Sequence, residues 1–453
     1  MRDIKLRFIG NMVMVLGAAA CLAAAQDHET KADALLDKLV EKGVLTAAEA
    51  EQLRRETAEA APAADRDPSL VQFSWKDGLR FQSADGKTFK GKLGGRIMTD
   101  VAAFTESGGV APVDAEAEFR RVRLYTSGKF NPDFPVAYKL QVDFAGSDVA
   151  FKDVYLDLPE TPVVGGVKLG HFKEPMGLNE LTSSKYITFM ERATPVEAFA
   201  PSRNLGVAVG DAVGQERMTW SLGAFTDVRM EAGDHDATLS GDYRITGRLT
   251  ALPWYDEASG GARLLHVGLS GSFVDPENDT VRYRSRPEAH LAPRLVDTGG
   301  IAADHSYLLG AEAALVLGPL SLQGEYLQSW VETPAGRDPS FFGAYGQVSY
   351  FLTGEHRVYD RGKAEFGRVK PKANFSPHGG GWGAWEAAVR YSYLDLNDAG
   401  VNGGRLSDVS AGLNWYLNPN MRIMFNYVFA DAGDRGTADG ELHAFMARFQ
   451  VDF

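Results

Sequence analysis

The sequence is short of cysteine, of long apolar runs and of catalytic motifs. Its single cysteine, Cys21, lies in an N-terminal apolar segment, so the remaining chain can form no internal disulfide. Beyond that segment no run of about 18 apolar residues occurs, and the mean hydropathy of −0.21 is too polar for a helical membrane protein. The histidines lack metal-ligand spacing, and there is no G-x-S-x-G nucleophile motif. We therefore expect neither an enzyme nor a bound cofactor or metal.

Excess positive charge is also missing. Asp and Glu number 60 against 47 Lys and Arg, and the net charge of −13 argues against nucleic acid as a partner. Net charge does not report how charges are distributed within a site, so anion binding stays open. The 49 Gly, 25 Phe and 16 Tyr suit a chain of many strands and turns.

The N-terminus has the three parts of a secretory signal peptide. A basic region precedes an apolar core over residues 8–22, and three alanines before Gln26 form a small-residue cleavage site. We predict a signal peptide over residues 1–25. A lipoprotein would instead be acylated at Cys21, but Ala18 stands where such proteins carry Leu or Val.

Residues 26–78 are predicted to form a helical segment and linker in the periplasm. ADALLDKLVEKG places four apolar residues on one stripe, and Gly43 is suited to end that helix. In the next helix Thr46 and Glu49 have capping-box spacing. Residues 57–69 have linker composition. The segment is interpreted either as an oligomerisation element or as a spacer.

From residue 79 the pattern changes to alternation of apolar and polar residues, which is typical of strands with two different faces. In NMRIMFNYVF, for example, Met421, Ile423 and Phe425 oppose Arg422 and Asn426. Sixteen such strands are predicted, near 88–104, 118–130, 135–145, 149–159, 165–172, 203–212, 216–227, 241–253, 262–275, 304–318, 319–333, 341–354, 382–396, 405–418, 419–431 and 441–453.

The connections between these strands favour a barrel over a soluble β-sandwich. Short turns alternate with long polar loops, as in transmembrane barrels, although the connection over 354–381 is long at the short-turn end. The fold class is therefore predicted to be all-β: a sixteen-stranded antiparallel transmembrane β-barrel over residues 79–453, preceded by the helical periplasmic segment. A barrel of this size encloses an aqueous lumen. A secreted β-rich adhesin is the alternative.

Several stretches resemble the phosphate-selective porin O and P family. They are EFRRVRLYTSGKF at 118–130, FKDVYLDL at 151–158, the run from KLGHFKEP to SRNLGV over 168–207, and LTGEHRVYDRGKAEFGRVKPK at 352–372. The resemblance covers roughly residues 88–453. It implies a homotrimeric porin of the bacterial outer membrane, in contact with lipid, that passes small anions such as phosphate through a pore narrowed by an inward-folded loop.

Strand parity selects the cations expected to line the lumen. An arginine facing lipid at mid-bilayer costs about 2–4 kcal/mol, so Arg121 and Arg123 should face water. The same rule places Lys92, Arg96 and Lys139 inside. Arg120 falls on the apolar side, near a strand end, where it could snorkel or bend inward. Rings of arginine suit an anion pore. Alternatively, these positions are merely polar, because acids, including Asp153, share the wall.

The loop over 173–202 is long enough to fold into the lumen. It offers Ser183, Ser184, Lys185 and Arg192, and hydroxyls beside guanidinium groups suit an oxyanion. The resemblance implies phosphate-site roles for Arg96, Arg120, Arg121, Asp153, Ser183, Ser184 and Arg192. Glu180 departs from the family pattern, which has lysine there, and would repel a dianion. The loop's motif could also simply pack against the wall.

A basic block follows at 352–372. Its cations are Arg357, Arg361, Lys363, Arg368, Lys370 and Lys372. Parity puts them at the periplasmic end, where they form either an anion-exit cluster or a solvated surface. The sequence as a whole predicts an outer-membrane porin with an anion-preferring, water-filled channel for phosphate or a similar oxyanion. The alternative is a general diffusion porin without phosphate selectivity.

Overall fold

The computed structural model describes most of the chain in two compact units, 1–71 and 72–453. The predicted signal peptide, residues 1–25 with Cys21, lies outside the described residues. The structure describes residues 36, 38–42, 45–59, 70–131, 133–146, 149–226, 243–276, 279–434 and 439–453.

The first unit contains helix α3 (Ala47–Glu59). The predicted capping box is present, since Thr46 N donates to Glu49 Oε2 (2.8 Å) and Glu49 N donates to Thr46 Oγ1 (3.2 Å). Residues 38–41 are also helical, as expected for the preceding segment. No helix among the described residues is long and apolar enough to cross a membrane.

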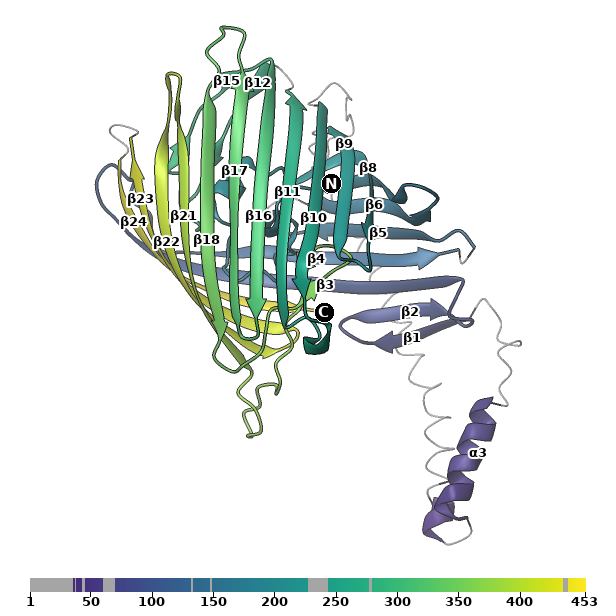
Figure 1. The fold of residues 1–453 in the computed structure, drawn as a ribbon. Coiled ribbons are helices and arrows are strands. Elements are labelled where there is room, and N and C mark those ends of the chain that lie inside the picture. Colours follow the sequence, from purple (N-terminus) through teal and green to yellow (C-terminus); the bar gives the residue numbers. More distant parts are fainter. Residues whose placement is uncertain are drawn as a thin grey trace, which may run out of the picture. The chain divides into compact units, whose positions relative to one another are not determined.

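The second unit is a closed antiparallel barrel of sixteen strands (Figure 1). Each strand pairs with the next along the chain, and the last strand pairs with the first, with Asp452 opposite Arg96. The strands are β3 (Phe89–Glu106), β4 (Glu116–Phe130), β5 (Val136–Asp143), β6 (Ala150–Thr161), β7 (Gly165–Lys173), β8 (Arg203–Val213), β9 (Met218–Thr226), β10 (Tyr243–Tyr255), β11 (Arg263–Asp275), β16 (His305–Leu317), β17 (Leu320–Glu332), β18 (Ser340–Phe351), β21 (Ala384–Asp398), β22 (Val401–Asn418), β23 (Met421–Gly433) and β24 (Gly440–Asp452).

All sixteen predicted strands are confirmed, with ends that differ by a few residues. The hairpin of β1 (Val71–Trp75) and β2 (Leu79–Ser83) was not among the predicted strands. β2 pairs with the start of β3, where β24 has already ended (Figure 1). The hairpin therefore continues the sheet beside the closing seam, and the Trp75 ring stacks on Phe453.

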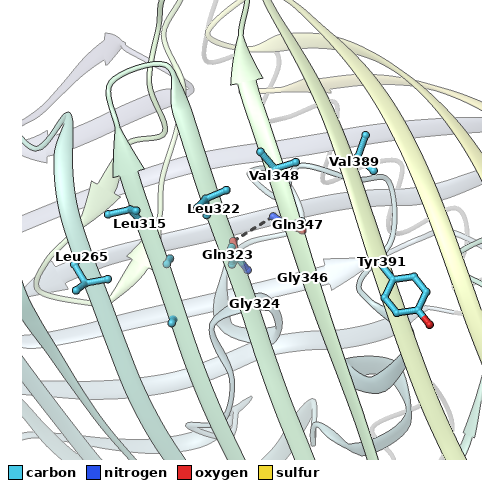
Figure 2. Close-up of a pocket in the computed structure, with 12 residues that line it drawn as sticks. Leu265, Leu315, Leu322, Gln323, Gly324, Gly346, Gln347, Val348, Val389 and Tyr391 are labelled. Atoms are coloured by element: carbon cyan, nitrogen blue, oxygen red, sulfur yellow. Dashed lines mark hydrogen bonds between the residues drawn. The ribbon is translucent and has the colours of Figure 1, made fainter.

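The outward side chains of the barrel are apolar, as the alternation predicts. Figure 2 shows part of this wall, where a shallow groove of about 490 Å³ lies over β11, β16–β18 and β21. Its floor is the paired Gly324 and Gly346, which leave the surface without side chains. The neighbouring Gln323 and Gln347 point inward and hydrogen-bond to each other. Polar groups of the wall are thus kept away from the apolar exterior.

Among the described residues, four connections carry internal structure. The connection between β10 and β11 contains the 3-10 helix η2 (Glu257–Ser259), and the other three are larger. The constriction loop (residues 174–202) contains α4 (Leu178–Leu181) and α5 (Thr194–Phe199). The mouth loop (residues 276–304) contains β12 (Thr280–Val281), β13 (Arg284–Ser285), β14 (Val296–Asp297) and β15 (Ile301–Ala302). The turn-end loop (residues 352–383) contains β19 (Tyr359–Asp360) and β20 (Glu365–Phe366) and lies at the opposite end of the barrel.

Part of the inward face is a hydrophobic core. Constriction-loop and mouth-loop residues pack on buried inward side chains of β16–β18 and β21–β24, named here the dry wall. Phe199 contacts Tyr283, which contacts Phe341 of β18, with ring centroids 5.2 and 5.8 Å apart. The aqueous lumen predicted from the size of the barrel therefore does not reach this wall, because two loops cover it.

Candidate functional site

The constriction loop crosses the lumen from β7 and β8 to the opposite side. Asn179 N donates to Glu325 of β17 (2.7 Å), and Asn414 of β22 donates to Thr188 O (2.8 Å). Arg422 of β23 donates to Ile187 O (2.9 Å). These bonds span a large part of the barrel circumference. The loop thus folds into the lumen, as the sequence predicted for residues 173–202.

Arg120 and Arg121 both point inward because of a β-bulge. The pairing of β3 with β4 slips after Met98, which faces Arg121, so that Thr99 faces Phe119. Arg120 is the extra residue, and Phe119 becomes the exposed outward residue. Alternation alone places Arg120 on the apolar side, where it was expected to snorkel or bend inward; its side chain lies inward because a bulge reverses parity within the strand.

Three arginines converge on Glu191 of the constriction loop. Arg120 binds it through two bonds of 2.9 Å, and Arg448 of β24 approaches to 2.7 Å. Arg121 Nη2 lies 3.9 Å from the same carboxylate. Arg448 also forms a two-bond pair with Asp100 of β3 (2.7 and 2.6 Å). Cations therefore outnumber carboxylates in this group.

Arg96 and Arg123 face each other across β3 and β4. Arg96 is buried and donates to Ser184 Oγ at 2.7 Å, whereas no carboxylate of the described residues forms an ion pair with it. Arg123 pairs with Asp143 of β5 at 2.6 Å. Like charges opposite each other destabilise a sheet, so their juxtaposition is a feature that stability alone does not favour.

A second basic group lies on β5, β6 and β8. Asp153 accepts from Arg203 at 2.6 Å and also bonds Lys139. Its carboxylate therefore positions two cations. We use the name charged wall for eight of the inward cations of β3–β8: Arg96, Arg120, Arg121, Arg123, Lys139, Lys168, Lys173 and Arg203.

Lysines also gather around the Tyr125 ring. Lys92, Lys139 and Lys185 hold their ammonium groups 5.6, 5.9 and 5.9 Å from its centroid. Lys185 additionally pairs with Asp452 at 3.3 Å. A tyrosine at this position attracts cations through its ring face while adding no negative charge.

Ser183 and Arg192 shape the constriction loop itself. Ser183 O accepts from Tyr186 N (2.7 Å) in a tight turn that presents Ser184 to Arg96. Arg192 pairs with Glu180 at 2.6 Å and donates to the Glu180 carbonyl at 2.8 Å. Lys173 pairs with the same carboxylate at 3.3 Å. The charge of Glu180 is thus offset by two cations.

The cations of the turn-end loop each contact different partners. Arg357 is buried, donates to Gln323 (2.9 Å) and stacks on Phe366. Arg361 pairs with Glu257 at 3.0 Å, and Lys363 pairs with Asp360 at 2.8 Å.

The other three cations lie further along the turn-end loop. Arg368 reaches Asp452 and the Pro419 carbonyl. Lys370 and Lys372 are exposed. The predicted exit cluster stays a prediction.

Sequence reasoning missed several inward groups. Arg448 lies in the polar series of the last predicted strand, so parity could have selected it. Arg203 shares the series of the outward Leu205 and Val207, so parity would not have selected it. Glu191 could not be found in this way, because loop residues carry no parity. Among the described residues no group of three or more His, Cys, Asp or Glu side chains could hold a metal.

The protein family described as "Phosphate-selective porin O and P" matches residues 92–453 of the chain. The chain belongs to this porin family. This porin is 32% identical over 410 residues to an uncharacterized protein of Caulobacter vibrioides, covering 86% of this chain and 79% of that one. It is 28% identical over 439 residues to "Porin O" of Pseudomonas aeruginosa, covering 85% and 93%.

Among solved structures, the fold is similar to the anion-selective porin from Comamonas acidovorans. The TM-score is 0.53 at 13% identity, over 81% of this chain and all of that one. Such a likeness supports the fold alone. Family and barrel together make the chain a porin of the bacterial outer membrane.

Proposed function

We propose that this porin conducts small anions in preference to cations, with phosphate or a similar oxyanion as its substrate. One observation carries the proposal: Arg96 is buried beside Arg123 and a serine hydroxyl, and no carboxylate of the described residues pairs with it. A guanidinium that has no carboxylate at ion-pair distance and lies next to a hydroxyl can replace part of an oxyanion's hydration. Several such sites in series let the anion enter and leave.

Glu180 does not weigh against anions as strongly as its residue type suggests. Arg192 and Lys173 both hold it at ion-pair distance. Its charge is therefore largely compensated within the loop. The alternative of a general diffusion porin without phosphate selectivity predicts that phosphate leaves the chloride current unaffected.

The test is recording in planar bilayers. A KCl gradient should give a reversal potential of the sign for anion selectivity, and phosphate added to chloride should reduce the chloride current. Arg121→Glu and Arg192→Glu should each lower anion preference. A cation-selective wild type would overturn the anion claim, and unchanged selectivity in both variants would overturn the roles of these arginines.

The remaining assignments belong to the same proposal. We infer that the porin acts without catalysis, assembles as a homotrimer in contact with outer-membrane lipid, and binds no nucleic acid. Residues 1–25 act as the signal peptide and residues 26–78 as a periplasmic segment. Cross-linking of the detergent-solubilised protein tests the trimer, and N-terminal sequencing of the mature protein tests the cleavage site.

A further inference from the structure

Glu191 occupies the position that an anion would take among the arginines of the constriction. Its two carboxylate oxygens each accept a 2.9 Å bond from Arg120, the planar two-bond arrangement in which arginine also binds phosphate. Arg448 approaches one of the oxygens, and Arg121 lies near the other. A side chain of the protein thus makes the contacts expected for a substrate.

Arg121 has bonding capacity that Glu191 leaves unused. It is only 4% exposed, and among the described residues its Nε has no hydrogen-bond partner and its Nη1 reaches just the sulfur of Met98 at 3.6 Å. A buried guanidinium with unsatisfied donors is costly unless something else binds it. Arg448 differs, since Asp100 pairs with it independently.

We propose that the Glu191 carboxylate is a built-in counterion that a permeating oxyanion displaces from Arg120 and Arg121. It sets how tightly the pore holds its substrate. With the carboxylate in place, the arginines are partly neutralised between passages, so an entering anion must compete with it for them. This weakens binding and favours release, which rapid conduction requires. The inference rests on the proposed anion conduction and assigns a specificity-determining role to Glu191.

The backbone of the loop is held without the Glu191 side chain. Arg390 donates to the Glu191 carbonyl at 3.1 Å, and Arg448 donates to the Met190 carbonyl. A change limited to the carboxylate therefore leaves these anchors in place. Glu191→Gln keeps the size of the side chain and removes its charge.

The experiment measures block of chloride current by inorganic phosphate in planar bilayers containing wild-type porin or E191Q. Glu191→Gln should lower the half-blocking phosphate concentration about tenfold, which equals about 1.4 kcal/mol. Its reversal potential in KCl should move further toward anion selectivity. Adding Arg121→Gln to E191Q should abolish the gain, because the freed arginine is what the phosphate binds.

The matched control is Glu197→Gln, which removes the same charge from the same loop. Glu197 pairs with Arg286 of the mouth loop at 3.3 Å, and among the described residues it forms no ion pair with Arg120 or Arg121. It should change phosphate block far less than E191Q does.

Unchanged or weaker phosphate block in a folded E191Q porin would overturn the proposal, as would an equal gain in E197Q. The proposed function, anion preference, is tested by the reversal potential of the wild-type porin alone. A wild type that prefers cations, combined with an E191Q shift toward anions, would refute anion preference but retain the counterion role.

Discussion

The dry wall and the charged wall are both built from strands in which apolar and polar residues alternate, yet their inward side chains differ in character. On β21–β24 the inward residues near the loop end are apolar and buried, including Leu394, Leu406 and Val428. On β3–β8 they include the arginines and lysines of the charged wall, together with acids such as Asp143 and Asp153. Both walls face the lumen, so facing inward does not by itself decide whether a side chain is hydrated.

What decides it is the constriction loop and its partner, the mouth loop. They bury their own apolar residues against the dry wall, which removes that area from water and stabilises the loops by about 25 cal/mol per Å² of apolar surface buried. The charged wall is then the side that remains for ions. The asymmetry links stability to function: packing on one wall fixes the loop that presents Ser184 and Glu191 to the other.

The largest expected effect comes from truncating the dry wall. Phe341→Ala removes a fully buried ring that packs on Tyr283 of the mouth loop. We expect a loss of about 3–5 kcal/mol in the free energy of unfolding, measured by guanidinium unfolding in detergent. Phe342→Ala, the outward neighbour with 37% exposure, is the control and should cost far less. Equal losses would show that the two faces of β18 are energetically alike.

The second effect concerns selectivity. Arg123→Gln leaves Asp143 unpaired on the charged wall. One charge about 8 Å from an anion changes its energy by about 2 kcal/mol at an effective dielectric constant of 20, before screening. We expect the anion-to-cation permeability ratio to fall several-fold, as measured by reversal potential. Arg422→Gln is the control on the far side of the constriction loop, where Arg422 holds the Ile187 carbonyl; it should change selectivity less.

The third effect is that of salt. Raising the ionic strength from 0.1 to 1 M shortens the Debye length from about 10 to about 3 Å. Half-buried cations such as Lys139 should lose influence, whereas buried ones such as Arg96 should keep more of it, because less water and salt surround them. Reversal potentials at a constant concentration ratio should show anion preference that shrinks without vanishing. Complete loss would mean that exposed charges alone produce it.

The sequence predicted the strands well because alternation is local and repeats sixteen times. It predicted the inward direction of Arg121, Arg123 and Lys139 for the same reason. Its alternation alone did not place Arg120 inward, since a bulge of one residue reverses parity and leaves no clear mark in the residue types. It also missed the dry wall, because the residues of a strand do not indicate which loop will pack against it.

Glu191 and the pairing of Glu180 show the same limit inside the candidate site. Both depend on contacts between residues far apart in the chain: Glu191 meets Arg120 from β4 and Arg448 from β24. The residue type of Glu180 suggested repulsion, whereas its neighbours compensate the charge. Local patterns report which residues share a face, but the sign of a site depends on how a loop places its carboxylates among distant cations.

The smallest effect is expected at Lys168, the most exposed end of the charged wall. Its side chain is 35% exposed, lies 3.9 Å from Asp157 and sits over the Tyr155 ring. Exposed pairs of this kind contribute about 0.2–1 kcal/mol, so Lys168→Gln should shift the reversal potential less than Arg123→Gln, and Lys168→Arg should not shift it. If selectivity arises at the buried cations beside the constriction loop, replacing a cation nearer the water should change the reversal potential less. A Lys168→Gln shift as large as that of Arg123→Gln would instead assign selectivity to the whole length of the charged wall.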